Sequence, residues 1–176
     1  KKGQILQQLG LKRQQYFLVT CHRQSNVESR ERFSGILEGL QRIRTQHEIP
    51  VVFPIHPHSR KKLEEFRLNC EGIMLLDPVD YMNFLQLERH AKVVLTDSGG
   101  VQEEACILGT PCVTLRRNTE RPETLEVGSN VLSGTNPEKI VEAVTWMYHL
   151  NKKWENPFGS GTAGKQILGI LKEMMG

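Results

Sequence analysis

The sequence predicts an α/β fold built on a doubly wound parallel sheet of the Rossmann-like type, and two observations support this prediction. Short apolar runs alternate with longer segments in which apolar residues recur at the helical period. Successive runs lie roughly 20–30 residues apart, as expected for the strand–helix–strand units of a parallel sheet. A chain of 176 residues is long enough for one well-packed domain, so we expect a single domain over residues 1–176.

The predicted elements follow one another in a regular order. Strands are expected at 16–20, 51–55, 73–76, 93–96 and 111–115, with a weaker one at 130–133. Helices are expected at 30–46, 58–66, 81–90, 101–108 and 137–150, and a loop-like segment at 151–162 leads to a last helix at 163–175. Capping residues mark helix starts after Asp80 and Asn136, and Gly109 marks a helix end. Ligands of doubly wound sheets bind at the carboxyl ends of the strands, so candidate site residues are sought there.

Composition and charge limit the classes of partner. The formal net charge is +3 and no basic stripe with interleaved aromatics occurs, which argues against nucleic acid. No apolar run approaches the ~18 residues of a membrane span. The four cysteines form no CxxC pair, which favours reduced thiols in a cytoplasmic protein. The opening KKGQILQQLG contains neither an initiator methionine nor the apolar core of a signal peptide, so we expect a fragment of a longer protein.

The stretch TDSGGVQEE at 96–104 joins the fourth predicted strand to the next helix. Two adjacent glycines let the backbone approach a bulky anion, and the first helical turn offers unpaired N–H groups. This pattern predicts a nucleotide-diphosphate site at Ser98, Gly99 and Gly100. Glu103 or Glu104 would then reach the ribose, because a carboxylate accepts two hydrogen bonds from a vicinal diol. The alternative is that Ser98 only caps the helix while the glutamates favour its positive end.

Histidines follow the first two predicted strands. His22 and Arg23 come after the first strand, where they are suited to acid–base work and to pairing with an anion. His56 lies between two prolines after the second strand, in a stiff turn that would fix the imidazole. Without a cysteine or acid at ligand spacing, His56 and His58 do not indicate a metal site. The alternative for His22 is an ordinary polar loop residue.

Two further clusters follow the third and fifth strands. Arg116, Arg117 and Arg121 lie after the fifth strand, and the guanidinium fork suits phosphate, although a solvated charged loop is the alternative. Tyr81 and Phe84 lie just past the third strand, where one ring could border a flat base. Packing in the core is the alternative for at least one of these two rings.

Four motifs together resemble the non-hydrolysing UDP-N-acetylglucosamine 2-epimerases. They are HRQSN at 22–26, HP at 56–57, TDSGGVQEEA at 96–105 and TERPE at 119–123. They occur in the family's order and at its spacing, and the match runs from about Tyr16 to the C-terminus. The resemblance implies that the chain is the C-terminal, nucleotide-binding half of a GT-B-type two-domain fold and that the N-terminal half is absent.

The resemblance also implies an activity and roles for individual residues. The family interconverts UDP-GlcNAc and UDP-ManNAc, by eliminating UDP to a 2-acetamidoglucal and adding it back, without a cofactor, and it serves cell-envelope polysaccharide biosynthesis. The resemblance implies that Ser98, Gly99 and Gly100 hold the diphosphate and that Glu104 binds the ribose. His22 would be the catalytic residue that helps the leaving group depart, Phe84 would border the base, and Arg121 would lie near the cleft. Arg23 and His56 would contact a second, allosteric nucleotide-sugar.

Two departures from the family pattern limit what this chain is expected to do. Gln24 and Ser25 replace the usual arginine and acid, which weakens the case for the second nucleotide-sugar. The carboxylates for proton transfer at C2 belong to the absent half, so the chain alone should bind UDP compounds weakly and catalyse poorly; the full-length protein is expected to be a homodimer. The alternatives are a hydrolysing epimerase, the donor-binding half of a GT-B glycosyltransferase, and a non-catalytic nucleotide-sugar-binding module.

Overall fold

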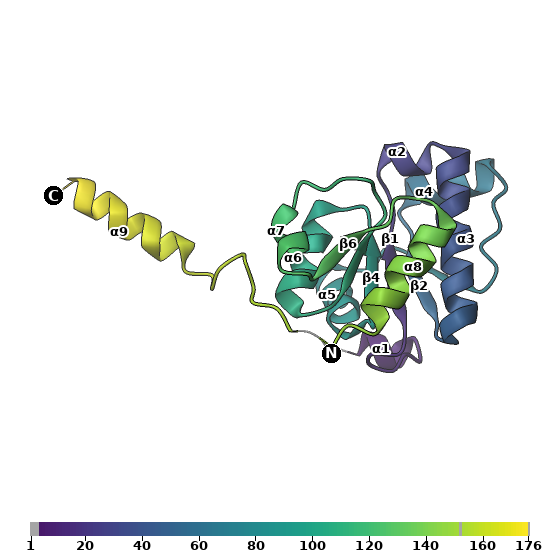
Figure 1. The fold of residues 1–176 in the computed structure, drawn as a ribbon, viewed down its shortest axis with the longest axis horizontal. Coiled ribbons are helices and arrows are strands. Elements are labelled where there is room, and N and C mark those ends of the chain that lie inside the picture. Colours follow the sequence, from purple (N-terminus) through teal and green to yellow (C-terminus); the bar gives the residue numbers. More distant parts are fainter. Residues whose placement is uncertain (1–3, 152, 176) are drawn as a thin grey trace.

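The computed structural model describes residues 4–151 and 153–175, and its centre is a six-stranded parallel sheet. The strands are β1 Phe17–Thr20, β2 Val51–Pro54, β3 Ile73–Leu76, β4 Val93–Thr96, β5 Cys112–Thr114 and β6 Asn130–Leu132. Their order across the sheet is β3-β2-β1-β4-β5-β6, and every neighbouring pair is parallel. The predicted doubly wound α/β fold is therefore confirmed, with the Rossmann order of strands (Figure 1).

Helices cover both faces of this sheet. They are α1 Ile5–Gln8, α2 Gln24–Val27, α3 Arg30–His47, α4 Pro57–Glu65, α5 Tyr81–His90, α6 Gly99–Leu108, α7 Pro122–Glu126, α8 Pro137–Tyr148 and α9 Ala163–Met175. Apolar residues of α3 and α8 pack on one face, and apolar residues of α1, α5 and α6 pack on the other. Covering both faces explains why the strands are near-continuous apolar runs.

The two core layers meet the alternating side chains of the strands. In β1, Phe17 and Val19 point into the layer under α3 and α8, while Leu18 points into the layer under α5 and α6. All three are fully buried. Helices α3 and α8 approach closely because Gly39 lies against Ile140: a Cβ at Gly39 would lie 3.0 Å from three side-chain carbons of that isoleucine.

Most element boundaries agree with the sequence-based expectations to within one or two residues. The ranges 73–76, 81–90, 93–96 and 163–175 are reproduced without change. Helices α1, α2 and α7 were not predicted, because four or five residues are too few to display a helical period. Helix α6 begins at Gly99, two residues before the expected start at 101. The low helix propensity of glycine argues against this start, yet Gly99 and Gly100 are both helical.

Helix α9 lies away from the sheet, at the end of an extended segment (Figure 1). The Trp154 indole N–H ties the start of this segment to the sheet domain by donating to the Cys106 carbonyl at 2.9 Å. The large apolar side chains of α9 are exposed: Ile167, Leu168, Ile170, Leu171 and Met174. No helix within the described ranges is long and apolar enough to cross a membrane.

Glu88 is a fully buried acid in the last turn of α5. Neither of its carboxyl oxygens has a hydrogen-bond partner among the described residues. Burial, with a smaller contribution from Glu104, raises the pKa of Glu88 to about 9. The native state therefore keeps a proton that the unfolded chain releases near the ordinary value of 4.5. Because the native state binds this extra proton in the window, the contribution of Glu88 to the free energy of unfolding falls as pH rises from 4.5 to about 9.

We predict that Glu88→Gln removes this pH dependence. The amide keeps the size of the side chain but needs no proton to be neutral. The free energy of unfolding of the variant should therefore rise relative to that of the wild type by on the order of 1 kcal/mol per pH unit through the window. Urea denaturation at pH 5, 7 and 9 measures the effect. Glu64→Gln, at an exposed position of α4, is the matched control and should follow the wild type. Parallel curves for the wild type and Glu88→Gln would contradict the assignment of a buried, protonated acid.

Candidate functional site

The strand order reverses between β1 and β4, and this switch point brings the predicted site residues together. Ligands of doubly wound sheets bind outside the carboxyl ends of the strands at such a point. The two strands end side by side, with the Thr20 and Thr96 hydroxyls 2.7 Å apart. The His22-Arg23 pair that follows β1 therefore faces the Gly99-Gly100 turn that follows β4, although 76 residues separate the two strand ends.

Asp97 is the buried centre of this edge. Its carboxylate accepts the backbone N–H of His22 at 3.1 Å and of Arg23 at 3.0 Å, as well as the Asn26 side-chain amide at 3.1 Å. The Cys21 thiol donates to it at 3.3 Å, and burial followed by the Asp97 charge raises the pKa of that thiol. No role was predicted for Asp97 or Asn26. Both lie inside motifs, at 96–105 and 22–26, and this placement was the sign in the sequence that pointed to them.

His22 and His56 lie beside one another at this edge, as their places after β1 and β2 implied. The two ring centroids are 6.4 Å apart, and Nδ1 of His22 lies 3.5 Å from the Asp97 carboxylate. About half of the His22 side chain is exposed. His56 caps α4, because its Nδ1 accepts the backbone N–H of His58 at 3.2 Å. The predicted stiff turn thus fixes the His56 imidazole by a hydrogen bond as well as by the flanking prolines.

The start of α6 has the form that an anion site requires. Ser98 occupies the N-cap position, but its side chain makes no capping hydrogen bond to the described residues, so capping is not its role. No acidic residue lies in the first turn, so Glu103 and Glu104 do not act at the positive end of the helix. The alternative interpretation, in which Ser98 caps the helix and the two glutamates favour its positive end, is therefore wrong. Within the described residues, the Ser98 hydroxyl thus makes no capping bond, and unpaired N–H groups at a helix start are donors that suit an anion.

Glu103 and Glu104 have different partners. Glu104 accepts the Tyr81 hydroxyl at 3.0 Å, which raises the pKa of Tyr81. Glu103 instead forms an ion pair with Arg121 at 2.7 Å. Tyr81 is the more exposed of the two rings near the end of β3, whereas Phe84 is partly buried against the core layer under α5 and α6. Glu104 and Tyr81 together form a polar, exposed pair beside the glycine turn.

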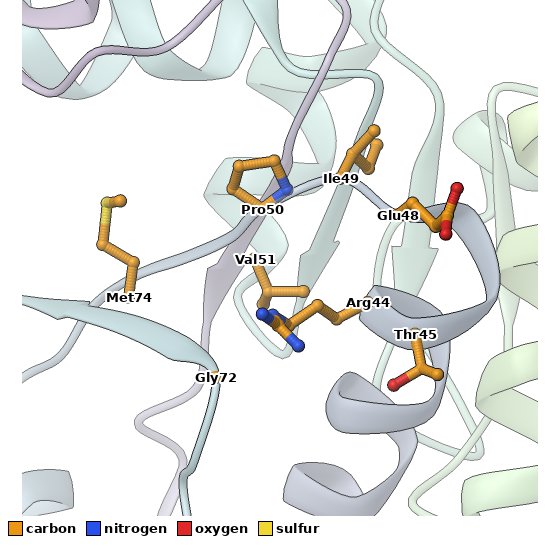
Figure 2. A pocket seen from close by; sticks show the side chains of 8 residues that line it. All are labelled: Arg44, Thr45, Glu48, Ile49, Pro50, Val51, Gly72 and Met74. Carbon is orange, nitrogen blue, oxygen red and sulfur yellow. The ribbon is translucent and has the colours of Figure 1, made fainter.

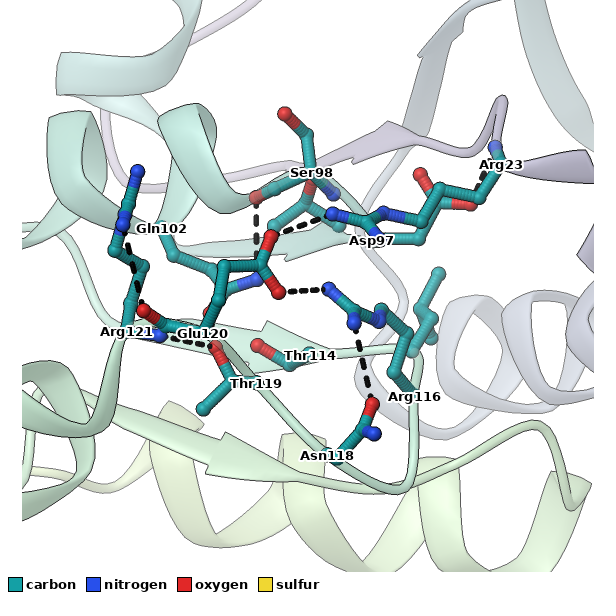
Figure 3. Close-up of polar contacts among 12 residues, drawn as sticks. Arg23, Asp97, Ser98, Gln102, Thr114, Arg116, Asn118, Thr119, Glu120 and Arg121 are labelled. Atoms are coloured by element: carbon teal, nitrogen blue, oxygen red, sulfur yellow. Dashed lines mark hydrogen bonds and ion pairs between the residues drawn. The ribbon is translucent and has the colours of Figure 1, made fainter. Parts of the chain in front are cut away.

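Figure 3 shows the Glu120 carboxylate between the guanidiniums of Arg23 and Arg116. The two donor–acceptor distances are 2.5 Å and 2.6 Å, and Arg116 also donates to Asn118 at 3.1 Å. The hydrogen bond from Arg116 is the main cause that lowers the pKa of Glu120. Arg116 is therefore part of an ion-pair network at the carboxyl edge and not of a solvated loop.

Two cavities lie at opposite edges of the sheet. One of about 250 Å³ adjoins the arginine network and is lined by Arg23, Asn26, Arg32, Arg116 and Arg117 among others. A larger one of about 560 Å³ lies between the end of α3 and the amino ends of β2 and β3 (Figure 2). The larger cavity is on the wrong edge for a ligand of this fold. No group of three potential metal ligands occurs within residues 4–151 and 153–175.

Fold and geometry together define a Rossmann-like domain with polar and charged side chains gathered at the switch point of its sheet. The chain belongs to the UDP-N-acetylglucosamine 2-epimerase family, whose model matches residues 1–172. A UDP-N-acetylglucosamine 2-epimerase of Methanocaldococcus jannaschii is 50% identical over 161 residues, which are 89% of this chain and 44% of that protein. The crystal structure of a UDP-GlcNAc 2-epimerase from the same organism, in complex with UDP-GlcNAc and UDP, superposes with a TM-score of 0.83 at 49% identity, over 90% of this chain and 45% of that one.

A glycosyltransferase shares the fold alone. The ADP-heptose LPS heptosyltransferase II of Escherichia coli superposes with a TM-score of 0.59 at 13% identity, over 82% of this chain and 50% of that one. The chain spans about half the length of the curated relatives that it matches.

We predict that Asp97→Ala destabilises the fold strongly. The substitution leaves two backbone N–H groups and the Asn26 amide without their acceptor, at a cost of about 3 kcal/mol in the free energy of unfolding. Urea denaturation at pH 7 measures it. Asp77→Ala removes an exposed carboxylate that pairs with Arg60 at 3.0 Å, and this control should lose less than about 1 kcal/mol. Equal losses for the two variants would show that Asp97 does not hold the edge together.

Proposed function

We propose that residues 1–176 form the UDP-binding domain of a UDP-N-acetylglucosamine 2-epimerase. One observation carries the proposal: His22, the Ser98-Gly99-Gly100 turn and Glu104 meet at the switch point of the sheet, in a chain of this family. Membership of the epimerase family supports the reaction, and the geometry at the switch point supports the binding of UDP by this chain.

The turn before α6 is the proposed diphosphate site. Its first-turn N–H groups, the Ser98 hydroxyl and the glycine backbone supply donors and room for phosphate oxygens. Glu104 is proposed to accept the two ribose hydroxyls, and the Tyr81 hydroxyl that it now holds would be released or shared. The uracil is proposed to lie near the end of β3, bordered by Phe84 or by the more exposed Tyr81. Arg121 is proposed to act at the edge of the cleft through its pair with Glu103.

The proposed reaction is an elimination followed by re-addition. Loss of the C2 proton and cleavage of the C1–O bond leave a C1=C2 double bond in the sugar and put negative charge on the departing UDP. Donors aimed at that charge accelerate the step. In this chain those donors are the first-turn N–H groups of α6 and the His22 imidazole, whose Nδ1 faces Asp97 at 3.5 Å. We assign proton transfer at C2 to residues outside this chain, so the chain alone should catalyse poorly.

The remaining half of the protein is proposed to be an N-terminal domain that completes a GT-B-type fold. The chain spans about half the length of its relatives, and the exposed apolar face of α9 requires a covering surface. By the family resemblance, we propose that the full-length protein is a homodimer. We also propose that it is cytoplasmic, because all four cysteines carry free thiols. Arg23 and His56 are proposed contacts of a second nucleotide-sugar, since both lie beside His22.

We predict that the chain binds UDP in a saturable manner. Glu104→Ala should weaken the affinity about 10–100-fold, because the ribose hydroxyls lose their hydrogen bonds to a charged carboxylate. Calorimetric titration with UDP measures this, and Ser98→Ala should weaken the affinity as well. Glu64→Ala, exposed on α4, is the control and should bind like the wild type. Wild-type affinity in Glu104→Ala would exclude the proposed ribose contact.

Product analysis on the full-length protein separates the candidate reactions. We predict UDP-ManNAc from UDP-GlcNAc with the full-length protein, and no epimerisation above a Glu104→Ala background with this chain alone. Free ManNAc with UDP would instead identify a hydrolysing epimerase. Turnover only with a sugar acceptor would identify a glycosyltransferase, which shares the fold. Binding without any turnover would identify a nucleotide-sugar-binding module.

A further inference from the structure

The Glu120 carboxylate lies directly over the start of α6. Its Oε1 is only 2.5 Å from the place where a Cβ on Gly99 would be. The same oxygen accepts from Arg23 at 2.5 Å, and the other oxygen accepts from Arg116 at 2.6 Å. An anion of this chain thus occupies space at the beginning of α6, and glycine at position 99 is what permits it.

The environment of Glu120 is suited to a phosphate group. Two guanidiniums converge on it from segments 93 residues apart, Arg23 after β1 and Arg116 after β5. Guanidinium groups bind carboxylates and phosphates with the same geometry. The side chains are partly exposed, 37% for Arg23 and 41% for Glu120, so a ligand from solvent can reach them. Arg116 is more enclosed at 14% and is held in place by Asn118.

We propose that the Glu120 carboxylate stands in for a phosphate group when no nucleotide is bound. A nucleoside diphosphate displaces it, and Arg23 and Arg116 then pair with the phosphate oxygens. This inference rests on the proposed function, since it requires that the diphosphate binds at the start of α6. It adds Arg116 to the ligands of the diphosphate, assigns Arg23 to the diphosphate in place of the second nucleotide-sugar, and makes Glu120 a residue that sets the affinity.

Two anions cannot share this place, because like charges at close range repel one another. Glu120 must therefore move or be neutralised when the diphosphate enters. Removal of the Glu120 charge therefore raises the affinity for the diphosphate, whereas removal of an ordinary binding residue lowers it. A purely structural role for Glu120, in which it orders the loop after β5, has the opposite consequence: loss of the charge would loosen Arg116 and weaken the affinity.

The test is a calorimetric titration with inorganic pyrophosphate and, separately, with UDP. Glu120→Gln is expected to bind both ligands on the order of tenfold more tightly than the wild type, since the two ion pairs of the Glu120 carboxylate no longer compete with the ligand. Arg116→Gln is expected to bind both more weakly. Glu123→Gln is the matched control, because Glu123 is an exposed acid of the same motif, and it should bind like the wild type. Unchanged or weaker binding by Glu120→Gln, with an unfolding midpoint equal to that of the wild type, would overturn the proposal.

Nitrogen-15 spectra of the arginine side chains provide a second, direct readout. Pyrophosphate should shift the Nε–H signals of Arg23 and Arg116 in the wild type, and unmoved signals at saturation would refute the exchange of partners. Saturable UDP binding with no gain in Glu120→Gln would overturn this inference and leave the proposed function standing. Tighter pyrophosphate binding in Glu120→Gln, with UDP no better than pyrophosphate, would support the inference and refute recognition of the uridine. Absence of binding to every variant would refute both.

Discussion

The buried carboxylate of Asp97 is the interaction on which the carboxyl edge of this sheet depends. It lies just after β4 and accepts hydrogen bonds from the backbone of His22 and Arg23, which follow β1. Through Asn26, which also donates to the Leu115 carbonyl at 3.1 Å, the same network reaches the end of β5. Three strand ends are thereby fixed relative to one another, and a charge that is buried in this way is stable only while its donors remain in place. The positions of the imidazole and of the first turn of α6 follow from it.

Three arginines near Asp97 pair with carboxylates of the chain itself. Arg23 and Arg116 share the Glu120 carboxylate, and Arg121 pairs with Glu103. The cationic groups of this edge are therefore already partly neutralised by carboxylates of the chain itself. Ligand binding at such an edge is an exchange of one anion for another, so affinity depends on the difference between two sets of ion pairs. Simple counting of arginines in the sequence does not measure this difference.

The fold was predictable wherever an element was long enough to show its period. The apolar runs of β3 and β4, and helices α5 and α9, coincide with the expected ranges. Parallel order followed from the alternation of strands and helices, because crossovers of this length return the chain to the same direction. Short helices were missed, α2 among them, although its residues form part of the HRQSN motif. Such a helix is held by the Asp97 network and not by its own propensity, since one turn is unstable in isolation.

The sequence by itself determined the sheet, the edge at which the motifs gather and the family of the chain, because these depend on local patterns and on motif order. Only the tertiary structure decided which glutamate pairs with Tyr81, that the Ser98 side chain makes no capping hydrogen bond to the described residues, and that Glu120 lies over Gly99. These outcomes depend on side chains that are distant in the chain, such as Arg23 and Glu120 with a separation of 97 residues. Their contacts arise from the order of the strands, and no local pattern encodes a distance across the sheet.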